Sequence, residues 1–311
     1  MNGLEHLVEG LFDYAGMFPP AQLDLRAALR ESARSSDLIR PGIVGNAMVV
    51  PYPQLHHITD QAVVEAGFGD RICTVCVVGV SAEKVEEAAR EVHGFNQARD
   101  HARVVTLETH AETIPAAPLL AAAKALSGIQ LYVEPTWIPK HWLKQRDDAL
   151  AFLNQAKATG HGVGLKVRGA GEQAVTKQLL ATLIQDVAHL RIPFKVTQGL
   201  HHPILEPRHK NRHGFVNAAA ALRLRQVHGA AFGRAAIREM LRENKPNAYD
   251  FTNGIAWRTY RMDLAQLRAV KAGIPFAVGS CSLQEPDADL ARLWPPSASP
   301  TAVIPKPRRG H

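Results

Sequence analysis

The architecture follows from two stretches of this sequence, Gly164-Leu-Lys-Val-Arg-Gly-Ala-Gly171 and Pro193-Phe-Lys-Val-Thr-Gln-Gly-Leu-His-His-Pro203. In each stretch an apolar run of strand character carries a lysine near its end and then breaks at glycine. Barrels built from alternating strands and helices place catalytic groups in this way, at the carboxyl ends of neighbouring strands. We therefore interpret the chain as an enzyme built on an α/β barrel.

Apolar runs of strand length recur along the whole chain, with helical periods between them. Eight such strands are predicted, at residues 10–14, 44–50, 72–78, 102–107, 130–133, 162–167, 193–196 and 275–278. Repeated strand and helix units favour a parallel sheet, and eight of them favour its closure. The predicted fold is therefore α/β, a (β/α)8 TIM barrel.

The gap between the seventh and eighth predicted strands, about 200–273, holds a long helical insert. Its periodicity predicts helices over 213–228, 235–242 and 263–272, with a polar stretch at 249–261. Insertions of this size after a barrel strand usually border the catalytic face, cover it as a lid or form a subunit contact.

Composition is consistent with one large domain, because 311 residues with 46% hydrophobic and 21% charged residues can bury a sizeable core. We predict a single α/β barrel domain over 1–293 and a proline-rich basic tail over 294–311, which cannot form regular structure. The net charge of +7 is concentrated in this tail and in a loop at 208–212. A small anionic metabolite explains it more simply than nucleic acid, because no stacking aromatics interleave with the basic loop.

The beginning of the chain carries Glu5, His6 and Glu9 where a secretory signal needs a basic flank and an apolar stretch. No apolar run approaches the length that spans a membrane, so we expect a cytoplasmic protein with no membrane partner. Three cysteines fit a reducing compartment, and their odd number argues against a disulfide scaffold. Cys73 and Cys76 are expected on opposite faces of a strand, as buried structural thiols.

The candidate catalytic groups begin with Lys166 on the sixth predicted strand and Lys195 on the seventh. A buried lysine that desolvation or a nearby cation keeps neutral can attack carbonyls, and each lysine could supply that cation for the other. Alternatively, one or both pair with Glu134 or Glu108, which also lie near strand ends. Arg168 follows Lys166 by two and shares its face, where it suits a bidentate grip on a carboxylate or phosphate.

Histidines follow the seventh strand. Histidine is the side chain whose ordinary pKa suits acid–base catalysis at neutral pH. Adjacent residues point apart, so only one of His201 and His202 is expected to face the substrate. We assign proton transfer to His202 and substrate binding to His201, with Gln198, His213 and Asn217 as further binding residues. An alternative is a divalent metal held by His201, His202, His213 and Glu134, but no closed metal motif is present, so no cofactor is expected.

Polar side chains also occur beside the last and the first predicted strands. Ser280 and Ser282 follow the eighth strand beside a predicted helix start, the place where barrels often hold phosphate, although a plain turn with an N-cap is the alternative. Near the beginning of the chain, Asp13 lies in the last part of the first predicted strand. It could accept a proton or orient a lysine, or it could simply cap a turn.

The chain also resembles an uncharacterised bacterial family of TIM-barrel-like proteins, and that resemblance implies no activity. It rests on Leu11-Phe-Asp-Tyr-Ala-Gly16 with Pro19-Pro20-Ala21, Lys166-Val-Arg168, Gly199-Leu-His-His-Pro203, His213-Gly-Phe and Gly279-Ser-Cys-Ser282. Lysines on strands six and seven are similar to those of deoxyribose-phosphate aldolase and related class I aldolases, in which the strand-six lysine forms the Schiff base. This likeness implies the same role for Lys166.

The leading hypothesis is a cofactor-independent lyase of the class I aldolase type that acts on a small anionic carbonyl compound, a carboxylate or a phosphate. Lys166 is its Schiff-base amine, Lys195 the cation that lowers the pKa of that amine, and His202 or Asp13 the proton carrier. Arg168 and the 280–282 loop hold the anion. The alternatives are a metal-dependent hydrolase, isomerase or lyase, and a non-catalytic binding or assembly protein on a barrel scaffold, with 249–261 as a contact in a homo-oligomer.

Overall fold

The computed structural model describes residues 1–38, 47–206 and 213–295. Eight parallel strands close into a barrel, which confirms the predicted (β/α)8 fold. Around the barrel each strand is paired with its two neighbours in the order β1-β11-β7-β6-β5-β4-β3-β2. The strands are β1 (Phe12–Tyr14), β2 (Met48–Pro51), β3 (Cys73–Ser81), β4 (Ala102–Ala111), β5 (Gln130–Pro135), β6 (Val163–Arg168), β7 (Phe194–Thr197) and β11 (Phe276–Ser280).

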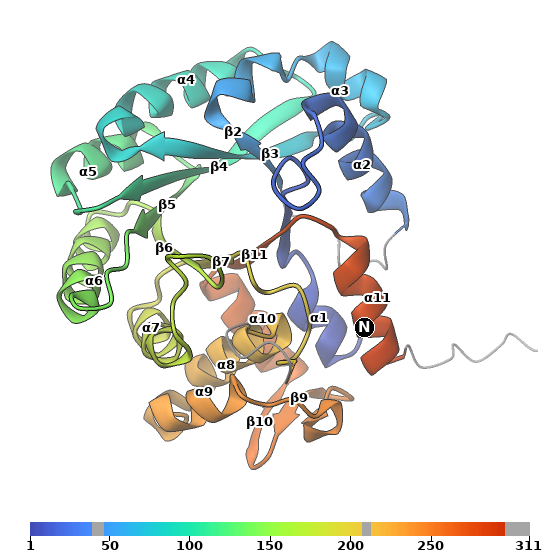
Figure 1. The fold of residues 1–311 in the computed structure, drawn as a ribbon, viewed down its shortest axis with the longest axis vertical. Helices are drawn as coiled ribbons and strands as arrows, with labels where there is room; N and C mark the ends of the chain where they lie inside the picture. The colour runs from blue at the N-terminus through green and yellow to red at the C-terminus, as the bar shows by residue number, and fades with distance from the viewer. Residues whose placement is uncertain (39–46, 207–212, 296–311) are drawn as a thin grey trace, which may run out of the picture.

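Helices surround the strands on the outside of the barrel (Figure 1). The helices that follow the first six strands are α2 (Leu25–Leu38), α3 (Asp60–Ala66), α4 (Val85–Gln97), α5 (Ala116–Ala125), α6 (Trp142–Ala158) and α7 (Lys177–Leu190), and a short α1 (Gly3–Val8) precedes the barrel. Local signals set several of their ends. The Thr176 hydroxyl caps α7 by accepting from the Leu179 N–H, and α3 ends at Gly67, whose φ of 97° suits glycine.

The segment between β7 and β11 contains three helices and a small separate sheet. The helices α8 (Phe215–His228), α9 (Arg234–Met240) and α10 (Leu264–Gly273) lie close to their predicted ranges. The polar stretch forms a three-stranded antiparallel sheet of β8 (Tyr249–Asp250), β9 (Gly254–Trp257) and β10 (Tyr260–Asp263). This sheet buries Ile255, Trp257 and Met262 and packs against α1, α8 and α10, so the insert is a mixed element rather than a purely helical one.

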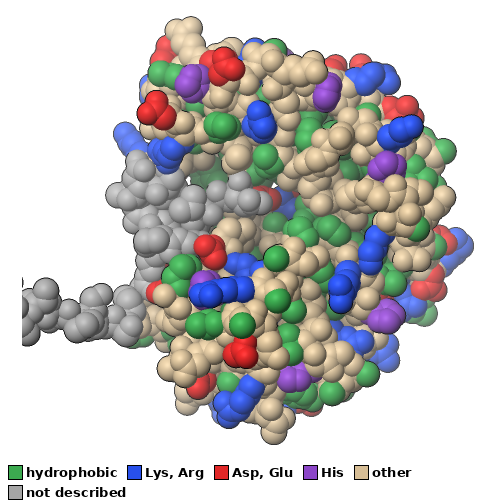
Figure 2. All heavy atoms as spheres, turned by 180° about the vertical axis from the view of Figure 1, so that it is seen from behind, with side chains coloured by type: hydrophobic (Ala, Val, Ile, Leu, Met, Phe, Trp, Pro, Cys, Tyr) green, Lys and Arg blue, Asp and Glu red, His purple; other side chains and the backbone are tan. Residues whose placement is uncertain are grey.

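The last barrel strand is followed by α11 (Gln284–Leu293). Among the described helices, none is long and apolar enough to cross a bilayer. Figure 2 shows acidic and basic side chains interspersed over one face of the molecule rather than gathered by sign. The predicted basic loop at 208–212 and the tail beyond residue 295 lie outside the described residues.

One glycine of the barrel wall is required by close packing. Gly164 on β6 is the register partner of Tyr132 on β5, and a Cβ at this position would lie 2.5 Å from Tyr132 Cε1 and 2.8 Å from the Pro193 carbonyl oxygen. A backbone oxygen cannot move aside as a flexible side chain can. Overpacking of this kind costs about 1–3 kcal/mol.

We therefore expect Gly164→Ala to lower the free energy of unfolding by about 1–3 kcal/mol, measured by chemical denaturation. The matched control is Gly94→Ala on α4, where the new Cβ meets nothing within 4 Å and alanine favours the helix. That change should raise the free energy of unfolding by about 0.5–1 kcal/mol. Equal effects of the two substitutions would contradict the packing argument.

Candidate active site

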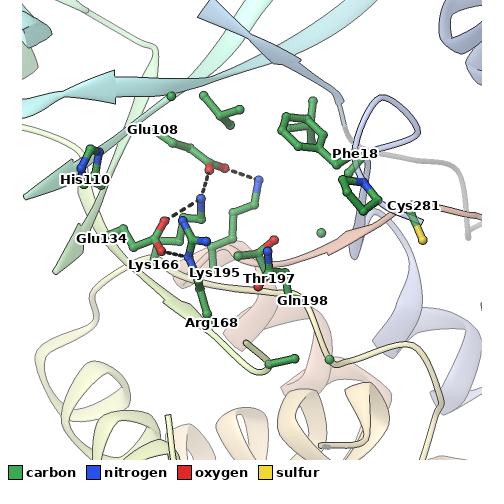
Figure 3. Close-up of a pocket in the computed structure, with 18 of the residues that line it drawn as sticks. Phe18, Glu108, His110, Glu134, Lys166, Arg168, Lys195, Thr197, Gln198 and Cys281 are labelled. Atoms are coloured by element: carbon green, nitrogen blue, oxygen red, sulfur yellow. Dashed lines mark hydrogen bonds and ion pairs between the residues drawn. The ribbon is translucent and has the colours of Figure 1, made fainter. Parts of the chain in front are cut away.

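A cavity of about 410 Å³ lies at the carboxyl ends of the barrel strands. Its charged lining residues come from neighbouring strands, with Glu108 from β4, Glu134 from β5, Lys166 and Arg168 from β6, and Lys195 from β7. Figure 3 shows these five side chains converging on one side of the cavity. Barrel enzymes hold their catalytic groups at this end of the strands, so the cavity is the candidate active site.

The charged side chains form one continuous ionic network. Lys166 Nζ lies 2.5 Å from Glu108 Oε2 and 2.9 Å from Glu134 Oε2, and Arg168 Nε contacts the other oxygen of Glu134. Lys195 Nζ lies 2.5 Å from Glu108 Oε1 and also contacts Asp13. Glu108 therefore accepts from both ammonium groups, one on each carboxylate oxygen.

Strand register explains why these residues meet. Lys166 and Lys195 are register partners on β6 and β7, so their side chains rise side by side. The strand β4 extends to Ala111, beyond the expected end at residue 107, and this extension places Glu108 inside the barrel wall. Alternation along each strand then brings Arg168 to the same side as Lys166.

Burial and pairing together set the ionisation of the network. Burial lowers the pKa of Lys166, but the charges of Glu108 and Glu134 outweigh it, so this pKa is raised. The pKa of Lys195 is raised well above its ordinary value for the same reason, with Asp13 as the main opposing charge. The charge of Lys195 does lower the pKa of Lys166, as expected, but the neighbouring carboxylates prevail over it, so Lys166 is not kept neutral.

Glu108 shows the complementary effect. Burial raises the pKa of its carboxyl group, but the two lysines more than compensate and bring this pKa to about 2. The group is therefore a carboxylate at neutral pH, and both lysines are charged. The network joins three basic side chains, Lys166, Arg168 and Lys195, to three acidic ones, Asp13, Glu108 and Glu134. Burial raises the pKa of Asp13, although the charge of Lys195 opposes this shift.

Cys76 also belongs to this network, which the sequence did not indicate. Its Sγ donates to Glu108 Oε1 at 3.1 Å and lies 3.5 Å from Lys195 Nζ. Cys73 packs in the main core, so the two thiols are buried on opposite faces of β3 as expected. Burial, followed by the charge of Glu108, raises the pKa of the Cys76 thiol, so it acts as a hydrogen-bond donor.

Potential metal ligands gather at the same place. Within the described residues, the group whose ligand atoms lie within 4.8 Å of one another consists of Asp13, Cys76 and Glu108. The ammonium of Lys195 contacts all three of these side chains. The cation that this group holds is therefore the lysine itself, and the alternative metal set built from histidines and Glu134 is not brought together.

The two histidines after β7 point apart, as expected. His201 lines the cavity, with its Nδ1 3.8 Å from Glu285 Oε2. His202 turns away to α11, where its Nδ1 lies 2.6 Å from Asp289 Oδ2. His202 is not among the cavity-lining residues, so the structure places this predicted proton carrier outside the cavity.

His213 and Asn217 lie behind the cavity and have structural roles. The Nε2 of His213 lies 3.3 Å from the Val175 carbonyl oxygen, and burial lowers the pKa of this imidazole to about 4. Asn217 Nδ2 donates to the carbonyl oxygens of Met240 and Glu243 at 2.8 Å each, at the end of α9. Neither residue lines the cavity, because both side chains are buried in the core, His213 just before α8 and Asn217 on it.

The hydroxyl groups of Ser280, at the end of β11, and of Ser282 stabilise the turn that follows this strand. Ser280 Oγ donates to the Ser282 carbonyl oxygen at 2.5 Å, and Ser282 Oγ accepts from the Glu285 N–H at 3.2 Å. Neither serine lines the cavity, whereas Gly279 and Cys281 do. These hydroxyl groups are therefore used within the turn and at the start of the next helix, which matches the alternative expectation rather than an anion-binding site.

The remaining predicted residues are at the site, and several others join them. Gln198 lines the cavity with a φ of 59°, and Asp13 lies beneath it against Lys195. His110 and Thr197 were missed, although each follows a charged strand residue by two and so shares its face. No described residue between Leu205 and Phe276 lines the cavity, so the described part of the insert does not cover it.

Comparison with known proteins adds little to this geometry. No family model matches the chain, and no curated protein matches it. A solved structure described as a xylose isomerase-like TIM barrel/4-hydroxyphenylpyruvate dioxygenase fusion protein aligns with 92% of this chain at 12% identity and a TM-score of 0.43. The alignment spans 42% of the length of that protein, so the site must be interpreted from its own residues.

Removing the shared carboxylate should test the network. We expect Glu108→Gln to lower the free energy of unfolding by about 3–5 kcal/mol, because two buried ammonium groups lose a common partner. The control is Glu112→Gln, an exposed glutamate just beyond β4, which should change the free energy of unfolding by less than about 0.5 kcal/mol. Denaturant titration of both variants measures the difference, and a small effect at Glu108 would contradict the network.

The lowered pKa of Glu108 also predicts how the free energy of unfolding changes at acid pH. The pKa of Glu108 is lowered from 4.5 to about 2 in the folded protein, so its stabilising contribution is fully present above the unfolded value. It is lost as pH falls from about 4.5 to about 2. The difference in unfolding free energy between the wild type and Glu108→Gln should therefore shrink across this range, and a difference that stays constant would contradict the lowered pKa.

Proposed function

We propose that the protein is a lyase of the class I aldolase type, in which Lys166 forms a Schiff base with a small anionic carbonyl compound. The observation that carries the proposal is the position of Lys166, between two carboxylates in a cavity at the barrel strand ends, beside Arg168. Lys195 suits the role less well, because its side chain is 1% exposed and is held by Asp13 and Glu108.

A raised pKa does not exclude Lys166 from this chemistry, because a proton acceptor is already in contact with it. The ammonium transfers a proton to Glu134 or Glu108, and the free amine attacks the carbonyl carbon to form a carbinolamine. The returning proton leaves with the hydroxyl group as water. The ammonium and the carbonyl compound thus become an iminium and one water molecule, and the positive charge between the two glutamates is unchanged.

The neighbouring residues then have distinct roles. Arg168 offers five N–H donors, of which Nε contacts Glu134, and its side chain is 38% exposed at the cavity. It is the proposed partner of the substrate anion. Glu134 and Glu108 replace His202 as proton carriers, because they touch Lys166. Lys195, fixed by Asp13, keeps Glu108 ionised.

The other candidate functions find less support. A metal-dependent reaction would need a cation among Asp13, Cys76 and Glu108, where the Lys195 ammonium lies. A non-catalytic assembly role remains compatible with a homo-oligomer, but it gives no reason for burying six charged groups at a cavity. We further propose a reducing, cytoplasmic location, in keeping with three free cysteines.

Borohydride trapping tests the proposal directly. The purified protein is treated with a pool of small aldehydes, 2-oxo acids and sugar phosphates under reducing conditions, and adducts are located by peptide mass spectrometry. We expect a stable secondary amine on Lys166. Lys166→Arg, which keeps the charge between Glu108 and Glu134, should lose the adduct while remaining folded.

Lys124→Ala, at an exposed lysine on α5, serves as the control and should retain wild-type labelling. An adduct on Lys195 instead would exchange the roles of the two lysines. If the complete pool leaves no adduct on either lysine, the Schiff-base proposal fails.

A further inference from the structure

The wall of the cavity across from Glu134 and Arg168 is apolar, and Cys76 joins it to the ionic network. Val49 on β2 and Val78 on β3 belong to a small hydrophobic cluster that is separate from the main core, and Ala15 and Phe18 pack against it. All four residues line the cavity. Figure 3 shows Phe18 on the far side of the cavity from Glu134 and Arg168. This apolar wall offers no hydrogen-bonding side chain to a sugar hydroxyl.

Each cation of the charged wall already has a carboxyl partner, which bears on the anion that this wall can accept. Its three cations are each paired with a carboxylate of the same network. A phosphate group carries a charge of about −1.5 to −2, and binding it here would leave a large uncompensated charge in a buried site. A monocarboxylate adds a single charge and matches the fork of one arginine.

The phosphate site predicted after β11 is also unsuited to an anion. The hydroxyls of Ser280 and Ser282 are used within the turn, and the first turn of α11 carries Glu285 and Asp287. These acidic side chains already interact with the positive end of the helix dipole and would repel a second anion.

The two cations that face the cavity share one carboxylate. Lys166 Nζ and Arg168 Nε contact the two oxygens of Glu134, so both cations lie beside the same small group. A 2-oxo acid has its carboxylate bonded directly to its carbonyl carbon, so both of its polar groups can reach these two neighbouring cations. A carbonyl and a phosphate at opposite ends of a sugar cannot both do so.

We propose that the substrate is a 2-oxo acid with an apolar aliphatic or aromatic side chain. Its carboxylate binds Arg168, its carbonyl carbon faces Lys166, and its side chain lies against Val49, Val78 and Phe18. The covalent step of this inference rests on the proposed function, whereas the binding mode does not.

The test compares three probes in cyanoborohydride trapping: 4-methyl-2-oxopentanoate, pyruvate and glyceraldehyde 3-phosphate. Burial of each methylene is worth a factor of about 4 in affinity, so the first probe should label Lys166 at a concentration at least about 10-fold lower than pyruvate. It should also label at a lower concentration than the sugar phosphate. Equal or better labelling by the sugar phosphate would overturn the inference and leave the proposed function standing.

An analogue that cannot react separates the proposed substrate class from the proposed lysine chemistry. The corresponding 2-hydroxy acid, 2-hydroxy-4-methylpentanoate, cannot form a Schiff base, and its binding can be followed by calorimetry. Binding at least about 10-fold tighter than that of lactate, without any trapped adduct, would support the substrate class and reject the lysine chemistry. Failure of this analogue to bind more tightly than lactate would overturn the substrate class.

Substitutions on the apolar wall give a matched comparison. We expect Val78→Thr, which adds a hydroxyl at nearly constant volume, to raise the half-saturating concentration of 4-methyl-2-oxopentanoate about 5-fold or more. The value for pyruvate should change less than about 2-fold, because pyruvate lacks the atoms that reach this wall. Val64→Thr, at a valine on α3 that is 50% exposed, is the control and should alter neither value. An equal change for both acids in Val78→Thr would contradict the binding mode.

Discussion

The sharing of one buried carboxylate by two ammonium groups is the interaction on which the site depends. Glu108 alone joins Lys166 to Lys195, and through them Glu134, Arg168 and Asp13 enter the same network. Any one of these charges would be costly to bury by itself, because desolvation disfavours the charged form. Lys166, Lys195 and Glu108 stay ionised together, and the raised pKa values of the lysines and the lowered pKa of Glu108 are two consequences of the same pairing.

The closed barrel divides the cavity chemically by strand. Consecutive strands β4 to β7 supply the charged side chains, whereas β2, β3 and the segment after β1 supply the apolar ones. Because a barrel brings these two arcs face to face, a molecule in the cavity contacts both at once. This division is a property of the strand order, and it explains how a charged wall and an apolar wall can occupy one small cavity.

The sequence predicted the barrel and the strands that carry the lysines, because apolar runs that end at glycine are local signals. It also predicted that Cys73 and Cys76 are buried on opposite faces, since strand alternation is local as well. It could not predict that His202 turns to Asp289, or that Asn217 holds the end of α9, because those contacts join segments far apart in the chain. The sign of the Lys166 pKa shift was missed for a related reason. It depends on three neighbours from other strands, and their distances are set by register.

The arrangement also distinguishes two ways of making a lysine reactive. One lowers the pKa of the amine so that a free amine exists at rest, and this requires a dominant like charge or an apolar pocket. Here the carboxylates dominate, so the amine is charged at rest and a proton acceptor lies 2.5–2.9 Å away. In the proposed reaction the iminium carries the same charge as the ammonium it replaces, so the glutamates that stabilise the resting lysine stabilise the proposed covalent state to a similar extent. The proposed step therefore needs no rearrangement of the charges around the lysine, because those charges are in place before a substrate arrives.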